Sequence, residues 1–253
     1  AWFHFLARLL KANLWEVLAI IGVAQLCLQP WISGSFRQRA ATIPVLLLLH
    51  VVMSYFWNFA FVLGLPNGLD RLWGTEGIRC WDGGLLGIVS WCSVVLAGTL
   101  ACDLAGPGSD PRPAARRLLI LGGVCCCLGY LLNCVSSLYV SDAAAQVPRS
   151  FAESPVWPDA ATVADRSSIQ RFAAPPFVPI SAAMPWNYWL MSKRLVSAPF
   201  VVFAIGFACL VYAGFVWVCD GHGWQSDVLR TFGQNALAAY ALHHLILGVV
   251  KPF

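Results

Sequence analysis

Six long apolar stretches set the pattern of hydrophobic and polar positions along this chain of 253 residues. Each is about 20 residues long and almost free of charged side chains, and a helix needs about that length to cross the ~30 Å hydrocarbon layer of a bilayer. They cover residues 14–32, 41–63, 84–104, 118–140, 197–219 and 229–250. The pattern predicts an all-α, polytopic bundle of about six transmembrane helices.

Neither a soluble core nor a membrane barrel explains these stretches. A core helix of a soluble protein carries charges on its outer face, and residues 43–52 and 200–218 contain none. Barrel strands alternate apolar and polar residues, and these runs do not. The composition agrees, because 59% of the residues are hydrophobic and 11% are charged, whereas about a quarter are charged in a soluble domain.

The charged and sulfur-containing side chains exclude two classes of partner. The formal net charge is +4, but the Lys and Arg residues are scattered, so they form no nucleic-acid footprint. Nearly all of the 10 cysteines lie inside the apolar stretches, and no CxxC pair is present. Small apolar packing is the role expected of such cysteines, and no metal site is predicted. The bilayer is the expected partner, and a homo-oligomer is compatible with this composition.

Two short arginine-rich links, residues 33–39 and 106–117, predict the topology. Short loops of this kind favour the cytoplasm, so the loop 64–83 and the long segment 141–196 are expected on the opposite face. Segment 141–196 is rich in proline, which removes backbone donors. We expect it to be a mostly extended extramembrane loop within one transmembrane domain, residues 1–253, of a multi-pass protein of the plasma (inner) membrane.

Polar residues in the two outer connections are candidates for binding a substrate. The loop 64–83 carries several charges and five glycines next to a span entry, so it can line a pocket or simply pair its own charges. The long segment ends with further polar groups. The candidates are Asn67, Asp70, Arg71, Asp82, Asn187 and Lys193.

Polar residues also interrupt the last apolar stretch. Asn235, Tyr240, His243 and His244 lie in it, and polar side chains inside a bilayer indicate function. Asn235 and His243 are eight residues apart, so they fall on nearly the same face of a helix. Histidine supplies acid, base or nucleophile chemistry near neutral pH. Capping or helix–helix hydrogen bonds are the alternative role, and they also apply to His50, Glu16, Gln25 and Gln29 in the first two stretches.

Several segments form a set in a fixed order. LWEVLAIIGVAQLCL precedes LPNGLDRLWG and WDGGLLGIVSWCSVVLAGTLACDL, and NYWLMSKRLVSAPFVVFAIGFACLVYAGFVWVCDGHGW precedes LRTFGQNALAAYALHHLI. The positions that carry the pattern in the last two are Asn187, Trp189, Ser192, Asp220, Gly223, Trp224, Gly233, Asn235 and Ala236. In these segments the chain resembles the late helices of the heparan-α-glucosaminide N-acetyltransferase family.

This resemblance implies a fold and an activity. The fold is a bundle of roughly ten helices, of which this chain is expected to be an N-terminally truncated fragment. The activity is transfer of an acetyl group from cytoplasmic acetyl-CoA to an amine or hydroxyl of a sugar or cell-envelope glycan across the membrane. One departure is clear, because the family's acyl-carrying histidine lies in a His–Ala–x–Trp-like loop and nothing here matches it; His4 has a different context.

Roles for the candidate residues follow from what acyl transfer requires. A thioester donor needs a base or nucleophile, donors for the oxyanion and cations for the CoA phosphates. Asn235, His243 and His244 are expected to polarise or deprotonate, and the six outer polar residues to contact the sugar. Arg112, Arg116 and Arg117 are placed to meet the phosphates, although the positive-inside rule also explains them. A transporter or flippase, and a membrane scaffold without catalysis, are the other two hypotheses.

Overall fold

The described part of the chain is mainly helical. The computed structural model describes residues 2–106, 108, 110–140, 150–164, 170–172, 174–177 and 183–236, with 238, 240, 242, 246 and 250. Within these residues no strand forms, and a single bridge joins Phe151 to Trp186. The elements in chain order are α1 (Trp2–Arg8), η1 (Leu9–Asn13), α2 (Val17–Ile32), α3 (Phe36–Met53), η2 (Ser54–Asn58), α4 (Phe59–Leu63), α5 (Gly68–Trp73), α6 (Gly84–Leu104), α7 (Pro111–Cys134), η3 (Val135–Tyr139), α9 (Ala160–Ala164), η4 (Gln170–Phe172), α10 (Ala198–Phe215), η5 (Val216–Asp220) and α11 (Asp227–Gln234).

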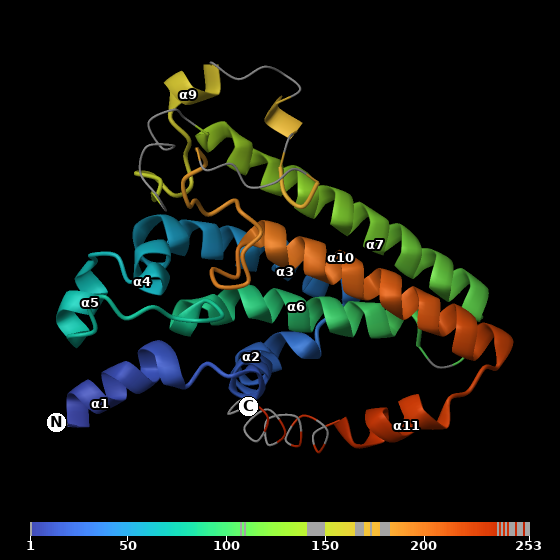
Figure 1. Ribbon diagram of the computed structural model, residues 1–253. Helices are drawn as coiled ribbons and strands as arrows, with labels where there is room; N and C mark the ends of the chain where they lie inside the picture. The colour runs from blue at the N-terminus through green and yellow to red at the C-terminus, as the bar shows by residue number, and fades with distance from the viewer. Residues whose placement is uncertain are drawn as a thin grey trace.

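Four helical stretches are long and apolar enough to cross a membrane. Among the described residues they are Phe36–Leu63, Gly84–Leu104, Pro111–Tyr139 and Ala198–Asp220. Figure 1 shows α3, α6, α7 and α10 running side by side along one bundle axis. The protein is therefore an all-helical bundle with the helices of a membrane protein.

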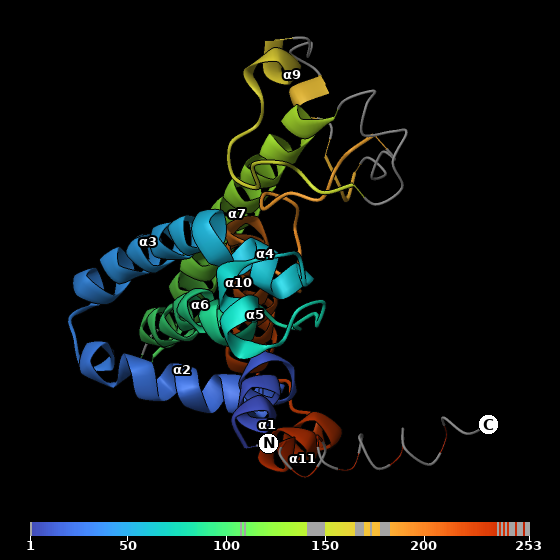
Figure 2. The same cartoon turned by 90° about the vertical axis from the view of Figure 1, so that its left-hand side faces the viewer.

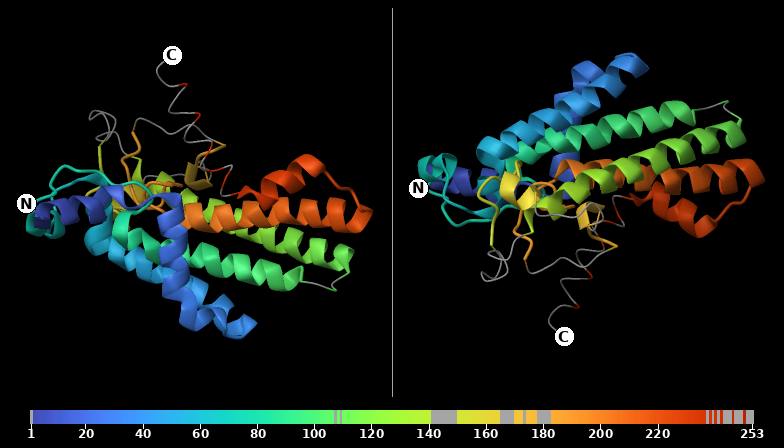
Figure 3. Two further views of the ribbon diagram at one scale, coloured as in Figure 1. Left: turned by 90° about the horizontal axis from the view of Figure 1, so that it is seen from below. Right: turned by 90° about the horizontal axis from the view of Figure 1, so that it is seen from above.

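The number of spans differs from the predicted six. Most of the first predicted span, residues 14–32, is α2, which is too short to be counted as a span by itself. It meets the preceding stretch Trp2–Ala12 at a bend of 89°, so the count among the described residues is four, or up to five if this pair forms one span. Figures 2 and 3 show α2 crossing the bundle rather than running along it. The last predicted span, residues 229–250, begins within α11, which ends at Gln234. Most of the residues that follow lie outside the described part of the chain.

Polar caps explain where two spans begin. The Ser35 side chain accepts a hydrogen bond from the Gln38 backbone N–H, and Gln38 Oε1 accepts one from the Ser35 backbone N–H, which closes a capping box at the start of α3. Asp110 accepts from the Arg112 backbone N–H directly before α7, whose first residue is Pro111. Both spans therefore begin in polar sequence and continue into the apolar run.

The closest helix contact joins α7 to α10. A methyl group on Gly206 would lie 2.6 Å from the Cys126 backbone nitrogen, and one on Gly129 would lie 2.6 Å from the Phe203 backbone nitrogen. Small residues let transmembrane backbones approach closely. The two helices therefore touch backbone to backbone, and any larger residue at these glycines would separate them.

The connections divide between the two ends of the bundle. Figure 1 shows α4, α5, α9 and the start of α10 at one end, and the end of α10 with the link before α7 at the other. The loop 64–83 and the described parts of the segment 140–197 thus share what we call the loop end. The short links 33–35 and 105–110 lie away from it.

Candidate functional site

A buried tyrosine attaches the long segment to the loop end of the bundle. The Tyr188 hydroxyl lies 3.0 Å from His50 Nδ1 and accepts a hydrogen bond from the Ala198 backbone N–H at 3.0 Å. His50 Nε2 lies 3.2 Å from the Asn58 amide nitrogen, and all three side chains are fully buried. Burial raises the pKa of the Tyr188 phenol, so it remains protonated. His50 therefore has a structural partner.

Two more spanning helices hold the same segment, residues 184–197. Ser90 of α6 donates a hydrogen bond to the Val196 carbonyl at 2.9 Å. Asn133 of α7 accepts from the Met191 backbone N–H at 2.8 Å. Ser90 and Asn133 are fully buried. Polar residues of α3, α6 and α7 thus fix the end of the long segment in one position.

The backbone is strained where this segment meets the start of α6. Asp82 and Val196 have φ angles of 51° and 49°, which non-glycine residues rarely adopt and which are unusual above all for a β-branched side chain. Gly83, at φ 81°, cannot carry a side chain, because a methyl group there would lie 2.6 Å from the Gly87 Cα. The Gly83 N–H donates to the Arg194 carbonyl at 2.8 Å. Such strain gathers at functional sites.

An ion pair lies at this junction. Lys193 Nζ is 3.3 Å from Asp82 Oδ1, and the side chains are 58% and 10% exposed respectively. Beside it, the Arg194 guanidinium lies 4.3 Å from the centre of the Trp81 ring. Two candidates predicted from different connections, Asp82 and Lys193, are thus brought together. The exposed ammonium keeps the pair open to solutes and lipids.

The Asp82 carboxylate is incompletely paired. Despite the ion pair, no described group donates a hydrogen bond to Asp82 Oδ1, which is buried. The carbonyl of the same residue is satisfied, since Trp91 Nε1 donates to it at 3.0 Å. Buried polar atoms nearly always have partners. Asp82 Oδ1 can therefore accept a hydrogen bond from a bound molecule.

A cavity of about 220 Å³ adjoins this ion pair. It lies between α2 and α6, and Figure 2 shows α2 passing beside α6. Its lining is Val17, Ile20, Ile21, Ala24, Asp82, Trp91, Val94, Val95 and Lys193. We call Asp82, Lys193, Arg194, Trp81 and this cavity the junction site.

A second carboxylate–ammonium pair joins the loop 64–83 to η1. Lys11 and Asp70 form an ion pair in which both side chains are fully buried. Asp70 also accepts hydrogen bonds from Thr75 Oγ1 at 2.7 Å and Asn67 Nδ2 at 2.6 Å, and Lys11 donates to the Thr75 carbonyl at 3.2 Å. Both charges, on Lys11 and Asp70, have protein partners. Asn67 and Asp70, which were predicted to bind substrate, therefore hold the loop 64–83 together.

The remaining outer candidates have other surroundings. Arg71 is exposed, and its Nε lies 3.9 Å from Glu76. Asn187 is fully buried, with its side chain bonded to the Pro185 carbonyl and the Trp189 backbone N–H. The structure does not bring either of them to the junction site.

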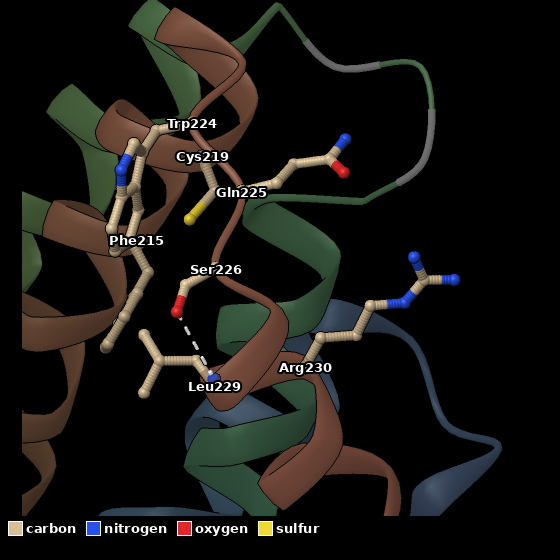
Figure 4. A pocket seen from close by; sticks show the side chains of 7 residues that line it. All are labelled: Phe215, Cys219, Trp224, Gln225, Ser226, Leu229 and Arg230. Carbon is tan, nitrogen blue, oxygen red and sulfur yellow. Dashed lines mark hydrogen bonds between the residues drawn. The ribbon is translucent and has the colours of Figure 1, made fainter.

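The other end of the bundle carries the predicted phosphate contacts. Arg112, Arg116 and Arg117 are exposed in the first turns of α7. At the same end, a cavity of about 450 Å³ lies between α10 and α11. Figure 4 shows its lining residues, with Arg230 pointing away from Phe215. Its lining is Phe215, Cys219, Trp224, Gln225, Ser226, Leu229 and Arg230. The three arginines and this cavity, which Phe215 and Trp224 help to line, therefore lie at the same end of the bundle, opposite the loop end.

Of the predicted catalytic residues, the structure describes Asn235, which does not line the cavity of the junction site. Asn235 is exposed at the end of α11, where its Nδ2 donates to the Thr231 carbonyl at 2.9 Å. His243 and His244 lie outside the described residues. In the part of the chain that the structure describes, no cluster of His, Cys, Asp or Glu has the composition of a metal site.

Sequence reasoning missed several residues of the loop end. Arg194, Trp81 and Lys11 are not among the residues that the sequence indicates for binding or catalysis. The signal available was a WDGG turn after a cysteine and a KR pair before an apolar run.

Comparison with protein-family models, curated proteins and solved structures finds no match to this chain.

Proposed function

We propose that this protein is an integral membrane acyltransferase that moves an acetyl or other acyl group from acyl-CoA to a sugar or cell-envelope glycan. The observation that supports it most is the junction site. There Asp82 and Lys193, two residues that the sequence indicates for acceptor binding, meet beside a cavity at the loop end of the bundle. The resemblance to the glucosaminide N-acetyltransferase family supports the same reaction, and the plasma (inner) membrane is the compartment we propose.

The proposed reaction is an acyl exchange. The amine or hydroxyl of the acceptor attacks the thioester carbonyl, a C–N or C–O bond forms, and the C–S bond breaks. The proton lost by the acceptor ends on the CoA thiolate, giving free CoA. Asp82 orients the attacking group by accepting its hydrogen bond. Acetyl-CoA is the co-substrate, and the reaction requires no metal.

The two ends of the bundle have different proposed tasks. Arg112, Arg116 and Arg117 supply cations for CoA phosphates at the end opposite the junction site. Asn235 and His243 remain the proposed groups that polarise or deprotonate between the donor and the acceptor. In this proposal the CoA phosphates are bound at one end of the bundle, the acceptor enters from the other, and the thioester and the attacking group meet between them.

The test is acetyl transfer by membranes that contain the protein. Labelled acetyl-CoA is supplied with glucosamine-type acceptors and with endogenous envelope glycans. Loss of one charge-assisted hydrogen bond corresponds to about 1.5–3 kcal/mol, so we expect Asp82→Asn to lower transfer by tenfold or more. Asn235→Ala and His243→Ala are expected to abolish it. Arg79→Gln, an exposed cation of the same loop, is the matched control and should transfer normally.

The outcomes separate the three hypotheses. Label that disappears in Asp82→Asn, with protein levels unchanged, supports the acyltransferase and the junction site. Transfer that is unaffected by Asp82→Asn contradicts the site. Folded protein that labels no acceptor contradicts the enzyme and favours a transporter or a scaffold.

A further inference from the structure

The cavity of the junction site is lined by hydrocarbon. Apart from Asp82 and Lys193 at its rim, its wall consists of aliphatic side chains of α2 and α6 and the Trp91 ring. A free sugar needs polar partners along its whole surface, because unpaired hydroxyls are costly in an apolar environment. The interior of this cavity therefore fits an alkyl or isoprenoid chain better than a sugar.

A second apolar cavity lies farther along α6, on the side of α10. It has a volume of about 440 Å³ between α6 and α10, and Trp91 and Val94 line both cavities. Gly98 lines its middle, and Cys102 and Tyr212 are also in its wall. From Trp91 to Cys102 the helix rises ~16 Å. The two cavities together offer a path for a long hydrocarbon chain.

The rim of this path carries charges that suit a phosphate. Lys193 is 58% exposed, and Arg194 stacks on Trp81 at 4.3 Å, so two cations flank the opening. Basic groups beside transmembrane helices bind lipid phosphates. Asp82 Oδ1 has the Lys193 ammonium 3.3 Å away but no hydrogen bond of good geometry from the described residues, and a hydroxyl or amine next to the phosphate can supply one.

We propose that the junction site binds a phosphate-headed lipid that carries the acyl acceptor. Its chain lies along α6, its phosphate contacts Lys193 and Arg194, and its head-group hydroxyl or amine donates to Asp82. That the lipid is the acceptor rests on the proposed function; that a phosphate-headed lipid binds rests on the cavities and the rim alone.

A blocking variant tests the chain path. A Cβ atom on Gly98 meets no atom within 4 Å, and the same is true of Gly123 on α7, outside both cavities. Gly98→Phe introduces a large side chain in the wall of the second cavity, and Gly123→Phe is its matched control for any effect of the same change on folding. After purification in detergent, mass spectrometry should find retained phosphate-headed lipid reduced fivefold or more in Gly98→Phe and unchanged in Gly123→Phe. Equal retention in Gly98→Phe and the wild type overturns the proposal.

A charge variant tests the rim. Purified protein is incubated with phosphatidylcholine nanodiscs that contain phosphatidylglycerol, a polyprenyl phosphate or uncharged diacylglycerol. We expect the wild type to enrich one of the two phosphate-headed lipids over diacylglycerol, which identifies the source of the phosphate. The enrichment should disappear in Lys193→Gln/Arg194→Gln and persist in Arg79→Gln. Enrichment that persists in the double variant, or that is absent from the wild type, overturns the proposal.

Failure of the lipid site is distinguishable from failure of the function. Transfer to soluble glucosamine without lipid enrichment contradicts the lipid-borne acceptor and leaves the acyltransferase intact. Lipid enrichment without any acyl transfer contradicts the acyltransferase and its acceptor role, and supports the binding site alone. Label from acetyl-CoA on the enriched lipid supports both.

Discussion

Two carboxylate–ammonium pairs at the loop end differ in how completely the protein surrounds them. In the Lys11–Asp70 pair both side chains are fully buried, and hydroxyl, amide and carbonyl groups complete their hydrogen bonds. In the Asp82–Lys193 pair the ammonium is 58% exposed and the carboxylate oxygen lacks a donor. The first pair is closed and serves the fold. The second has an unfilled contact, which marks a place for a ligand.

The largest expected difference concerns the reactivity of Cys80, which is buried near the closed pair. Burial raises the pKa of the Cys80 thiol from 9.0 to about 12. At about pH 8 the reactive thiolate is therefore about a thousandfold rarer than in an unfolded chain. We expect iodoacetamide to modify Cys80 only after unfolding, as measured by peptide mass spectrometry. Equal rates of alkylation in the folded and unfolded protein would show that Cys80 is accessible to the reagent in the folded protein.

Removing one partner of the closed pair is expected to have the next largest effect. Asp70→Ala leaves the Lys11 ammonium buried without its counter-charge, which costs about 3–5 kcal/mol of unfolding free energy. Thermal unfolding in detergent measures the loss. Lys11→Met/Asp70→Leu should recover much of it, because the charge and its partner leave together. A loss below about 1 kcal/mol in Asp70→Ala would contradict the buried geometry.

A smaller loss is expected when the closed pair keeps its charges and loses one donor. Thr75→Val has nearly the same shape but removes the hydroxyl that donates to Asp70 at 2.7 Å. Hydrogen bonds to charged groups contribute about 1.5–3 kcal/mol, so the apparent melting temperature should fall by less than in Asp70→Ala. Thr75→Ser retains the hydroxyl and is the control. If both variants melt alike, the hydroxyl is not the cause.

The smallest effect on stability is expected at the open pair. Lys193→Gln removes an ammonium that is 58% exposed, and such pairs contribute about 0–1 kcal/mol. We expect the melting temperature to stay close to that of the wild type, whatever happens to binding. A large loss of stability in Lys193→Gln would mean that the Asp82–Lys193 pair stabilises the fold as the Lys11–Asp70 pair does.

Four of the predicted spans could be located from apolar runs, because a long run without charges leaves few alternatives to a membrane helix. Two helices begin before their apolar runs: α3 begins at Phe36 rather than at residue 41, and α7 begins at Pro111 rather than at residue 118. The reason is that Ser35 and Asp110 cap a first polar turn of each helix. The bend in front of α2 was not predictable. It falls between Ala12 and Val17, at the edge of the apolar run and next to Lys11 and Glu16, and composition does not record its direction.

The site could be predicted less fully than the spans. Asp82 and Lys193 were both candidates, but their pairing depends on the tertiary contact between two connections. The role of Asp70 was hidden because its partner, Lys11, lies 59 positions earlier and resembles an ordinary basic flank. His50 was noticed as a polar residue in a membrane helix, yet its partner Tyr188 belongs to a segment whose proline content gives no sign of where it docks.

The backbone contact between α7 and α10 limits how the protein can move. With Gly129 and Gly206 pressed against the opposite backbone, sliding or tilting between these helices would force atoms into overlap. The two helices therefore travel as one rigid body. Any motion within the bundle therefore has to carry α7 and α10 together relative to α6, and it would change the second apolar cavity, whose wall α6 and α10 share.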